Sequence, residues 1–598
     1  MDRRAQRHAR RGLPGDDRLR AVPQRNRAVG MKRDSNPAPG SLRNYLRRFG
    51  NRTTVRHDVK AGLALGMHSV PDGLAAGLLA GVNPVHGLYG YLLGTAGGAL
   101  ATGSVFMSVQ VTGAMAVVVS DVPQAHDPEQ SSAVLATLAL LSGLVMLGLG
   151  LARLGSLVRY IPTAVLIGFI NAVALNIMLG QLDNFTGYDS QGDNRLSRAL
   201  DTVLHVVQLS WSACLVGGIT ILLVLWLERT ALGAMSMVVT VIIGSALAAA
   251  LALLPFAEPV LQLNSLATVP NTLPGLSLPD ISLVPELVLP ALSLALVGLV
   301  QGAGISGSIA NPDGRFPDPS ADFRGQGVAN LAASMFQGMP VGGSMSATSL
   351  VRAAGSKSAL ANLVAAAVIA VTILALGPVI GLVAMPALAG LLMLVGFRTL
   401  KIHDMLMVWR TGPIQAAVIA VTFVLTLLIP LQYSVLTGVG LAIILHISRQ
   451  ANRTVVKRWI FDSGTVLPRE AAPPATLAAG DLVVLVPYGS LFFAAAPVFE
   501  KQLPEIPTRC ERAVVVIRLR GKEDLGSTFI RTLESYARKL SEAGGTLLLS
   551  GLSQRAFEQF VTTGAISALG REHIFLAREH VGESLSEAIA FAEVWQRS

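Results

Sequence analysis

A series of long apolar runs constrains the fold of this chain more than any other feature of its sequence. The runs lie near 61–80, 85–101, 131–153, 161–182, 208–228 and 233–255, and again near 285–309, 359–380, 382–398, 412–430 and 432–448. Most have about the 20 residues that an α-helix needs to cross a hydrocarbon core of roughly 30 Å. Only 14% of the residues are charged, and the mean hydropathy is +0.55. These values predict a polytopic α-helical membrane protein and exclude an ordinary soluble domain.

Two stretches, residues 103–121 and 338–357, are too polar and too rich in small residues for ordinary lipid-facing helices. In the first, serine, threonine and glutamine crowd together until Gly113, where an apolar run begins. In the second, Pro340 and two glycines precede a hydroxyl-rich segment. Each pattern predicts a broken helix, in which extended backbone leads to a helix N-terminus whose partial positive charge and free N–H groups stabilise an anion. The alternative is that both stretches are loops that merely join helices.

Counting both halves of the chain predicts about fourteen transmembrane segments, seven in each half, with the broken stretch third in each. The Pro- and Leu-rich residues 256–284 separate repeat one, about 58–256, from repeat two, about 284–450, in a transmembrane domain of residues 58–450. An odd number of segments per repeat makes the repeats inverted, and an even total places both chain ends on one side. A basic run at 449–458 and the basic N-terminus predict that this side is the cytoplasm.

The N-terminal tail, residues 1–57, carries the positive charge of the chain. It holds 16 Lys and Arg residues against 4 Asp residues, whereas the net charge of the whole chain is +10. We expect the tail to be mostly disordered, cytoplasmic and in contact with anionic lipid. Nucleic-acid binding is the competing interpretation, but no folded basic module follows the tail. Cys214 and Cys510 lack metal-ligand spacing, so neither a metal nor another cofactor is predicted.

Two polar residues stand inside apolar spans. Asp72 follows Pro71 in the first span, and a carboxylate at that depth usually faces a cavity and has a function. Alternatively, Asp72 bonds the backbone groups that the proline frees. Gln301, in the span 285–309, either faces a cavity or bonds a neighbouring helix, an interaction worth on the order of 0.6 kcal/mol.

Residues 470–598 have the composition of a soluble α/β domain. We expect buried strands at 482–487, 513–519 and 546–550, and helices at 528–543, 553–562 and 584–595. Alternating strands and helices over about 110 residues predict a small cytoplasmic appendage.

Several long motifs in one order carry a resemblance to a known family. They are AGLALGMHSVPDGLAAGLLAGVNPVHGLYG at 61–90, SVQVTGAMAVVVS at 108–120 and GQGVANLAASMFQGMPVGGSMSATS at 325–349. With them the chain resembles the sulfate permease (SulP) family of anion transporters, and its C-terminal domain looks like a STAS domain. The resemblance implies an α-helical polytopic membrane protein with core and gate domains, built from two inverted seven-segment repeats and moving in an elevator-like cycle. It also implies a homodimer that carries sulfate, bicarbonate, a dicarboxylate or a related anion.

In that architecture the anion sits between the facing N-termini of the third and tenth segments, and the first and eighth segments complete the pocket. The resemblance therefore implies a particular set of site residues. The substrate-binding candidates are Gln110, Val111, Thr112, Gly113, Ser344, Ser346, Ala347, Thr348 and Gln301, and the candidate for ion coupling is Asp72.

Two of these positions depart from the family pattern. Many members have an acid where Gln301 stands, and because a glutamine cannot carry a proton, Asp72 is expected to take over proton coupling. Many have an arginine where Ala347 stands, so anion attraction is left to two helix termini and hydroxyl groups. Arg352, one turn further on, either compensates for that arginine or packs at the helix end.

The STAS-like domain also departs from the pattern. GSTF at 526–529 replaces the usual Asp-Ser-Ser/Thr-Gly loop, where some relatives are phosphorylated, so Thr528 is the candidate regulatory hydroxyl. Because the flanking Asp and Gly are replaced, we expect this domain to serve assembly and regulation, with a cytoplasmic partner that the sequence does not identify, and not to act as a phosphorylation switch.

The leading prediction is a secondary transporter of a small inorganic or carboxylate anion in the plasma membrane, the bacterial inner membrane, with proton symport through Asp72. The second is an anion exchanger or a channel-like anion conductance, favoured by Gln301 and Ala347. A nucleobase permease shares the inverted-repeat architecture, but it characteristically has acids in its eighth and tenth segments and no STAS-like domain. The sequence has no nucleophile elbow, P-loop, HExxH motif or metal-spaced His cluster, so an enzyme is not predicted.

Overall fold

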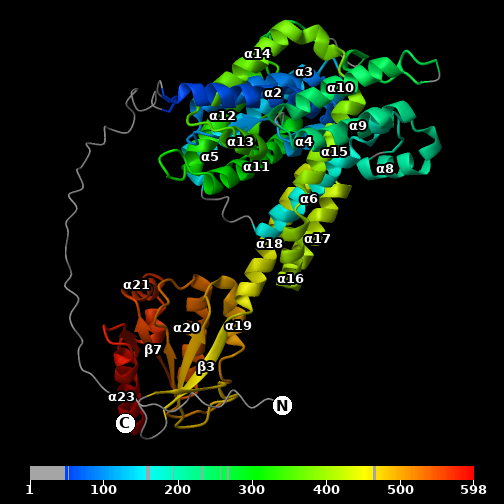
Figure 1. Ribbon diagram of the computed structural model, residues 1–598. Helices are drawn as coiled ribbons and strands as arrows, with labels where there is room; N and C mark the ends of the chain where they lie inside the picture. The colour runs from blue at the N-terminus through cyan, green and yellow to red at the C-terminus, as the bar shows by residue number, and fades with distance from the viewer. Residues whose placement is uncertain are drawn as a thin grey trace, which may run out of the picture.

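The structure is a computed structural model that describes residues 48–50, 53–155, 162–192, 194–230, 233–255, 257–265, 269–461 and 467–598. A large helical part and a smaller α/β domain are joined by α18 (Leu431–Ala451), which leads into the first strand of that domain (Figure 1). Most of the predicted basic tail lies outside the described residues. The chain is already helical at Val55, where α2 (Val55–Leu79) begins.

A first bundle takes helices from both halves of the chain. Its long helices are α2, α3 (Pro84–Ala101), α5 (Ser131–Leu151), α11 (Val284–Ser308), α12 (Pro319–Met335) and α14 (Leu360–Gly381). Glycines let these helices approach one another closely. A Cβ at Gly62 would lie 2.5 Å from the Ala361 carbonyl oxygen of α14, and one at Gly87 would lie 2.0 Å from the Gly73 carbonyl oxygen of α2. These glycines are packing positions, because no other residue fits between the helices.

A second bundle also takes helices from both halves. It contains α6 (Thr163–Leu179), α7 (Leu182–Thr186), α8 (Arg195–Leu204), α9 (Trp211–Leu227), α10 (Ser236–Leu251), α15 (Met385–Thr399), α16 (Ile402–Thr411), α17 (Pro413–Leu428) and α18. Here too a glycine sets a contact, since a Cβ at Gly390 of α15 would lie 2.6 Å from the Gly217 carbonyl oxygen of α9. The sequence analysis did not predict α8 and α16, because helices of 10 residues with one polar face lack a long apolar run.

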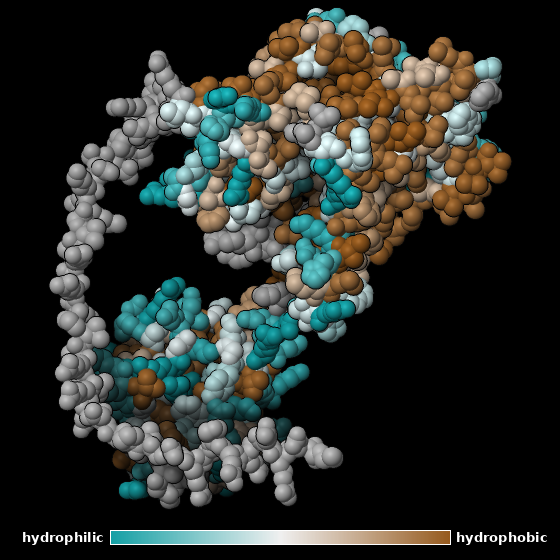
Figure 2. All heavy atoms as spheres, in the orientation of Figure 1, coloured by the Kyte–Doolittle hydropathy of each residue, from teal (hydrophilic) through white to brown (hydrophobic). Residues whose placement is uncertain are grey.

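The surface of the helical part is apolar, as contact with lipid requires. Figure 2 shows hydrophobic residues over much of this part and hydrophilic residues over much of the α/β domain. Within the described ranges, five helical stretches are long and apolar enough to cross a membrane: Ser131–Leu151, Thr163–Thr186, Ile281–Ser308, Leu360–Gly381 and Met385–Thr411. Helices α9, α10 and α17 are apolar but only 16 or 17 residues long. The total of fourteen crossings stays a prediction.

The described part of the C-terminal domain contains a six-stranded sheet in the order β4-β3-β5-β6-β7-β8. The strands are β3 (Val455–Ile460), β4 (Arg469–Ala471), β5 (Leu482–Tyr488), β6 (Val514–Arg518), β7 (Thr546–Leu552) and β8 (Ile574–Leu576). Strands β5 to β8 run parallel, and β3 pairs antiparallel with β4 and β5. Side chains alternate between the faces: Val515 and Leu547 pack toward α20 (Ser527–Glu542), and Val516 and Leu548 toward α23 (Glu583–Arg597).

The predicted strands and helices of this domain are confirmed to within about two residues, a margin that different definitions of an element's end allow. The second predicted helix, at 553–562, is α21 (Gln554–Thr562). Strands β3, β4 and β8 were not predicted. The sequence analysis assigned part of β3 to a basic run beside the membrane, and β4 and β8 have only 3 residues each.

Candidate functional site

Both predicted broken helices are present, and they meet. The first consists of β1 (Ser108–Gln110) and α4 (Gly113–Ser120), and the second of β2 (Gly342–Ser344) and α13 (Met345–Ala353). The strands pair antiparallel, with Ser108 opposite Ser344 and Gln110 opposite Gly342. Because antiparallel strands run in opposite directions, α4 and α13 leave this small sheet from opposite ends. The partial positive charges of both helix N-termini are therefore directed at the sheet.

Helix α12 supplies hydrogen bonds that the second broken helix needs inside the membrane. Asn330 accepts a hydrogen bond from the Val341 amide at 2.9 Å and donates one to the Val341 carbonyl oxygen at 2.6 Å. Gln326 accepts one from the Gly343 amide at 3.0 Å. Both carboxamides are fully buried, where unpaired backbone groups are costly. The sequence analysis missed both residues, although two carboxamides four residues apart on one helix face were a readable signal.

The first turn of α13 is lined with hydroxyl groups. Ser344 caps the helix: its Oγ accepts a hydrogen bond from the Ala347 amide at 3.3 Å and lies 3.2 Å from Ser346 Oγ. Ser346 is exposed, whereas Ala347 is buried. Thr348 is fully buried, donates to the Ser344 carbonyl oxygen at 2.6 Å and accepts from the Ser108 amide at 3.1 Å. Ser344 and Ser346 thus present hydroxyls at the helix start, while Thr348 ties α13 to β1.

The start of α4 is more apolar. Thr112 caps this helix, with its Oγ1 accepting a hydrogen bond from the Met115 amide at 3.4 Å. Gly113 opens the helix against α6 of the second bundle, because a Cβ there would lie 2.7 Å from Ile177 Cδ1. Val111 is buried beside Gly90 of α3. This N-terminus therefore offers backbone N–H groups and one hydroxyl at the boundary between the two bundles.

Gln110 is also buried, but its amide is directed at the first bundle. Its Nε2 donates to Ser69 Oγ of α2 at 2.9 Å and to Thr95 Oγ1 of α3 at 3.3 Å. Its Oε1 is buried and has no hydrogen-bond partner within the described residues. Gln110 therefore holds β1 against α2 and α3.

Asp72 and Gln301 lie on α2 and α11, and both are half-buried. Asp72 Oδ2 accepts a hydrogen bond from the Tyr91 hydroxyl of α3 at 2.6 Å. Gln301 Oε1 is buried without a hydrogen-bond partner in the described part of the chain. Arg352 is exposed in the last turn of α13, about 12 Å along the axis from Ser344. Its role toward the site stays a prediction.

A vestibule of about 900 Å³ lies at the C-terminal end of α4. Its walls include Ser120 and Asp121 from the first bundle, and residues of α7, α8 and the loop between them from the second. None of the predicted site residues is among the residues that line it. No sequence pattern predicted the vestibule, because its lining comes from segments far apart in the chain, among them α2, α4, α7, α8, α15 and α17.

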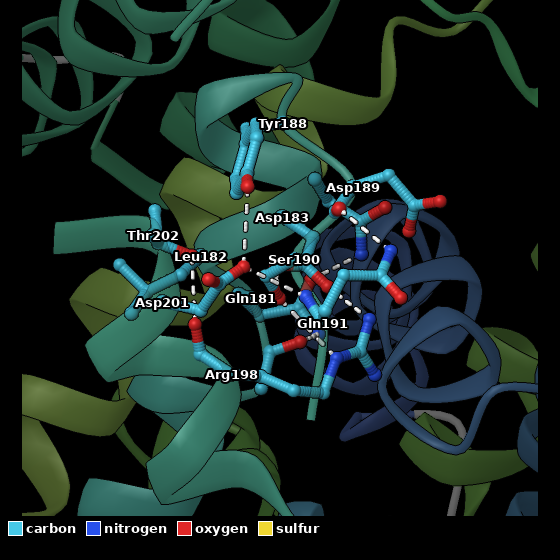
Figure 3. Close-up of polar contacts among 12 residues, drawn as sticks. Gln181, Leu182, Asp183, Tyr188, Asp189, Ser190, Gln191, Arg198, Asp201 and Thr202 are labelled. Atoms are coloured by element: carbon cyan, nitrogen blue, oxygen red, sulfur yellow. Dashed lines mark hydrogen bonds and ion pairs between the residues drawn. The ribbon is translucent and has the colours of Figure 1, made fainter. Parts of the chain in front are cut away.

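One wall of the vestibule is a polar network, shown in Figure 3. Arg198 binds Asp183 and lies 3.3 Å from Ser190 Oγ. Asp201 accepts hydrogen bonds from the Gln191 amide at 2.8 Å and from the Tyr188 hydroxyl at 3.2 Å. The bond from the Gln191 amide is the main reason that the pKa of Asp201 is below its ordinary value.

Thr528 lies far from these elements, in the α/β domain. It is the second residue of α20 and is exposed, and its carbonyl oxygen accepts a hydrogen bond from Thr532 at 3.1 Å. The hydroxyl is accessible, and its regulatory role stays a prediction.

The fold and the paired broken helices define a multi-pass membrane protein of the anion-transporter class with an α/β appendage. The sulfate permease family matches residues 55–422, and the STAS domain matches residues 474–581. The chain therefore belongs to the sulfate permease family, and its C-terminal domain is a STAS domain, as the resemblance predicted.

Named relatives agree with this assignment. The putative sulfate transporter YvdB of Bacillus subtilis (strain 168) is 24% identical over 531 residues, which cover 88% of this chain and 97% of the relative. The bicarbonate transporter BicA of Picosynechococcus sp. is 26% identical over 410 residues, which cover 67% of this chain and 71% of the relative. These relatives are transporters, which confirms the prediction that the chain is not an enzyme.

The structure of murine Solute Carrier 26 family member A9 (Slc26a9), an anion transporter, matches with a TM-score of 0.81 at 18% sequence identity. The match covers 94% of this chain and 97% of that one. It shows that the two proteins share a fold, including the arrangement of helical part and STAS domain.

Proposed function

We propose that this protein is a secondary active transporter of a small anion of the sulfate, bicarbonate or dicarboxylate class. The observation that carries the proposal is the antiparallel pair of β1 and β2, which directs the N-termini of α4 and α13 at one place inside the apolar part of the molecule. Two such termini, each worth about 0.3 to 2 kcal/mol depending on burial, attract an anion without a fixed cation. The anion need not leave water for a purely apolar environment.

In this proposal, the predicted residues fall into two groups with different tasks. The backbone of Thr112 and Gly113 and the hydroxyls of Ser344 and Ser346 contact the anion directly. A second group shapes the site around it: Gln110, Val111, Ala347 and Thr348, with Gln301 presenting its amide from α11. Because backbone N–H groups and hydroxyls bind any oxyanion, the site selects for negative charge more than for shape.

Elevator-type alternating access is the mechanism that suits this arrangement. The first bundle holds both broken helices, so it would carry the anion as it slides past the second bundle. The contact of Gly113 with Ile177 at the boundary is apolar, and an apolar contact loses little when it slides. We further propose a homodimer in the plasma membrane with both chain ends in the cytoplasm, where the STAS domain meets its partner.

Asp72 is the proposed group for proton coupling. It is a half-buried carboxylate in α2, and one of its oxygens is held by Tyr91. A carboxylate in a membrane span can carry a proton across, whereas Gln301 cannot. In this scheme proton and anion cross together.

The test is uptake of labelled sulfate, bicarbonate and succinate into proteoliposomes, each with and without an inward proton gradient. We expect saturable uptake of at least one anion, stimulated by the gradient. Asp72→Asn should remove the stimulation and spare exchange against a trans-loaded anion, while Glu129→Gln, which changes an exposed loop acid, should behave like the wild type. Gradient-stimulated uptake by the Asp72→Asn protein would show that another group couples the proton.

Uncoupled anion exchange is the second candidate, because Gln301 lies where many members of the family have an acid. An uptake rate that does not change with the proton gradient but rises with the concentration of anion on the trans side would favour exchange. Large unsaturable currents in electrical recording would favour a channel-like conductance instead.

A further inference from the structure

Arg195 connects the two bundles at the C-terminal end of α4. It is the first residue of α8, which packs against α6 and α17 of the second bundle. Its Nη2 atom lies 2.8 Å from Asp121 Oδ1 and 3.4 Å from the Val117 carbonyl oxygen, and it also binds Ser120 Oγ. One guanidinium group of the second bundle thus contacts three groups at the end of a helix of the first.

The position of Arg195 suits the charge that it meets. The last carbonyl groups of a helix have no partner within the helix and carry a partial negative charge, which a cation stabilises. Asp121 adds a full negative charge at the same place. The side chains of Arg195 and Asp121 are only 21% and 11% exposed, so solvent and salt screen this pair less than a pair on an open surface.

The two ends of α4 therefore meet the second bundle by different interactions. At the N-terminus, Gly113 faces the apolar side chain of Ile177, and packing of this kind changes little during a displacement of an ångström or two. At the C-terminus, the charged hydrogen bonds of Arg195 depend on distance and angle, and a displacement of a few ångströms breaks them. The ionic end selects one position of α4 relative to α8.

We propose that Arg195 is a positioning residue of the transport cycle. It anchors α4, whose N-terminus faces the anion, to α8 in the arrangement seen here, and its bonds break whenever the two bundles move relative to each other. This inference rests on the proposed function. The bonds of Arg195 would contribute to the free-energy difference between the arrangement of the bundles seen here and the arrangement after they have moved.

Arg198 offers a matched control for Arg195. It lies three residues further along α8, borders the same vestibule and carries the same charge. However, its partners Asp183 and Ser190 belong to its own bundle, as Figure 3 shows. Arg198→Ala therefore removes a vestibule charge without cutting a connection between the bundles.

The first measurement is amide hydrogen exchange of the full-length protein in lipid nanodiscs. In Arg195→Ala we expect peptides that cover residues 117–122 to exchange at least about fivefold faster than in the wild type, because the end of α4 has lost its anchor. Arg198→Ala should change the same peptides less than about twofold. Equal changes in both variants, or no change in either, would overturn the proposal.

The second measurement is the anion uptake rate at saturating substrate, per folded protein in proteoliposomes. We expect Arg195→Ala to change this rate by about threefold or more, while Arg198→Ala keeps the wild-type rate. Arg195→Lys should lie between the wild type and Arg195→Ala, since lysine keeps the charge but ends in an ammonium group on a differently shaped side chain, which does not reproduce the position of the Arg195 Nη2 atom. Faster exchange together with an unchanged uptake rate would mean that Arg195 only stabilises the fold.

Asp121→Asn keeps the test valid if Arg195→Ala does not fold. It removes one charge of the pair and should shift both measurements in the same direction by a smaller factor; wild-type values in both would overturn the proposal. Hydrogen exchange needs no substrate, so the anchor can be judged even if the wild type takes up none of the tested anions. In that case the proposed function fails, while hydrogen exchange still shows whether Arg195 anchors the end of α4.

Discussion

The two broken helices begin alike and end differently. Each has a 3-residue strand and a hydroxyl residue as N-cap, and they pair with each other. Beyond the first turn, α4 is apolar and its C-terminal end is bound by Arg195 of the second bundle. The loop after α13 is bound instead by Asp58 of α2, within the first bundle. One local pattern thus occurs in two settings. The end of α4 is bound by a residue of the other bundle, whereas within the described residues the loop after α13 is bound by Asp58 of its own bundle.

Asp58 holds the loop after α13 through several hydrogen bonds. It is fully buried at the start of α2 and accepts hydrogen bonds from the Lys357 amide at 2.7 Å, the Ser358 amide at 2.9 Å and the Ser358 hydroxyl at 2.8 Å. A buried carboxylate with several donors holds a loop firmly. The difference teaches that the similar sequence patterns of the two broken helices do not extend to the residues that anchor them.

The largest effect should come from Asn330→Ala, which removes the support of the β2 segment. Both the amide and the carbonyl of Val341 lose their partner inside the membrane, at a cost of about 1–3 kcal/mol for each group. We expect a clear loss of monodisperse protein after heating in detergent, measured by size-exclusion chromatography. Asn264→Ala, at an exposed position of a short 3₁₀ helix (Leu263–Ser265), is the control, and wild-type heat resistance of Asn330→Ala would contradict the interpretation.

Asp58→Ala should have the next largest effect, about 2–4 kcal/mol, because two amides and a hydroxyl lose a buried acceptor. Thermal stability measured in the same way should fall, while hydrogen exchange of residues 117–122 should stay as in the wild type. Asp313→Ala, an exposed loop variant, controls for the loss of an acid. Faster exchange in α4 after Asp58→Ala would show that the two anchors are not independent.

Gly113→Ala should cost about 1–3 kcal/mol by overpacking, since the new Cβ meets Ile177 Cδ1 at 2.7 Å. The double variant Gly113→Ala with Ile177→Val should recover most of the loss, because the next atom of Ile177, Cγ1, is 3.6 Å away. Uptake rate and heat resistance both report the effect. Gly148→Ala on α5 is the control, because nothing lies within 4 Å of its Cβ. If the double variant is no more stable or active than Gly113→Ala, then overpacking against Ile177 is not the reason that position 113 needs a glycine.

The smallest effect should come from Arg352→Ala at the exposed end of α13. Only the favourable interaction of a cation with a helix C-terminus is lost, about 0.3–1 kcal/mol. Uptake and heat resistance should stay close to the wild type, in contrast to Arg195→Ala at the equivalent end of α4. A loss of anion affinity in Arg352→Ala would support the alternative that Arg352 supplies positive charge to the anion site.

The elements that could be predicted from the sequence are those with a strong pattern over a short stretch of the chain. The apolar runs, the breaks at Gly113 and around Gly342, and strands β5, β6 and β7 of the STAS domain were predicted near their observed places, since each depends on residues within about twenty positions of one another. Elements without a strong local signal were missed, among them α8 and the short strand β8. The connecting carboxamides of α12 belong to the same class.

The sequence by itself determined that this chain is a membrane protein with two broken helices and a small α/β domain, because composition and periodicity express the cost of placing each residue in lipid or in water. The resemblance of its motifs to the sulfate permease family identified that domain as STAS-like. Only the tertiary structure decided that Ser108 pairs with Ser344 and that Asp58 accepts hydrogen bonds from the amides of residues 357 and 358. It also decided that Arg195 of one bundle binds Asp121 of the other. Such partners are 74 to 300 residues apart in the chain. Their pairing depends on how whole helices pack, and no single segment of the sequence contains that information.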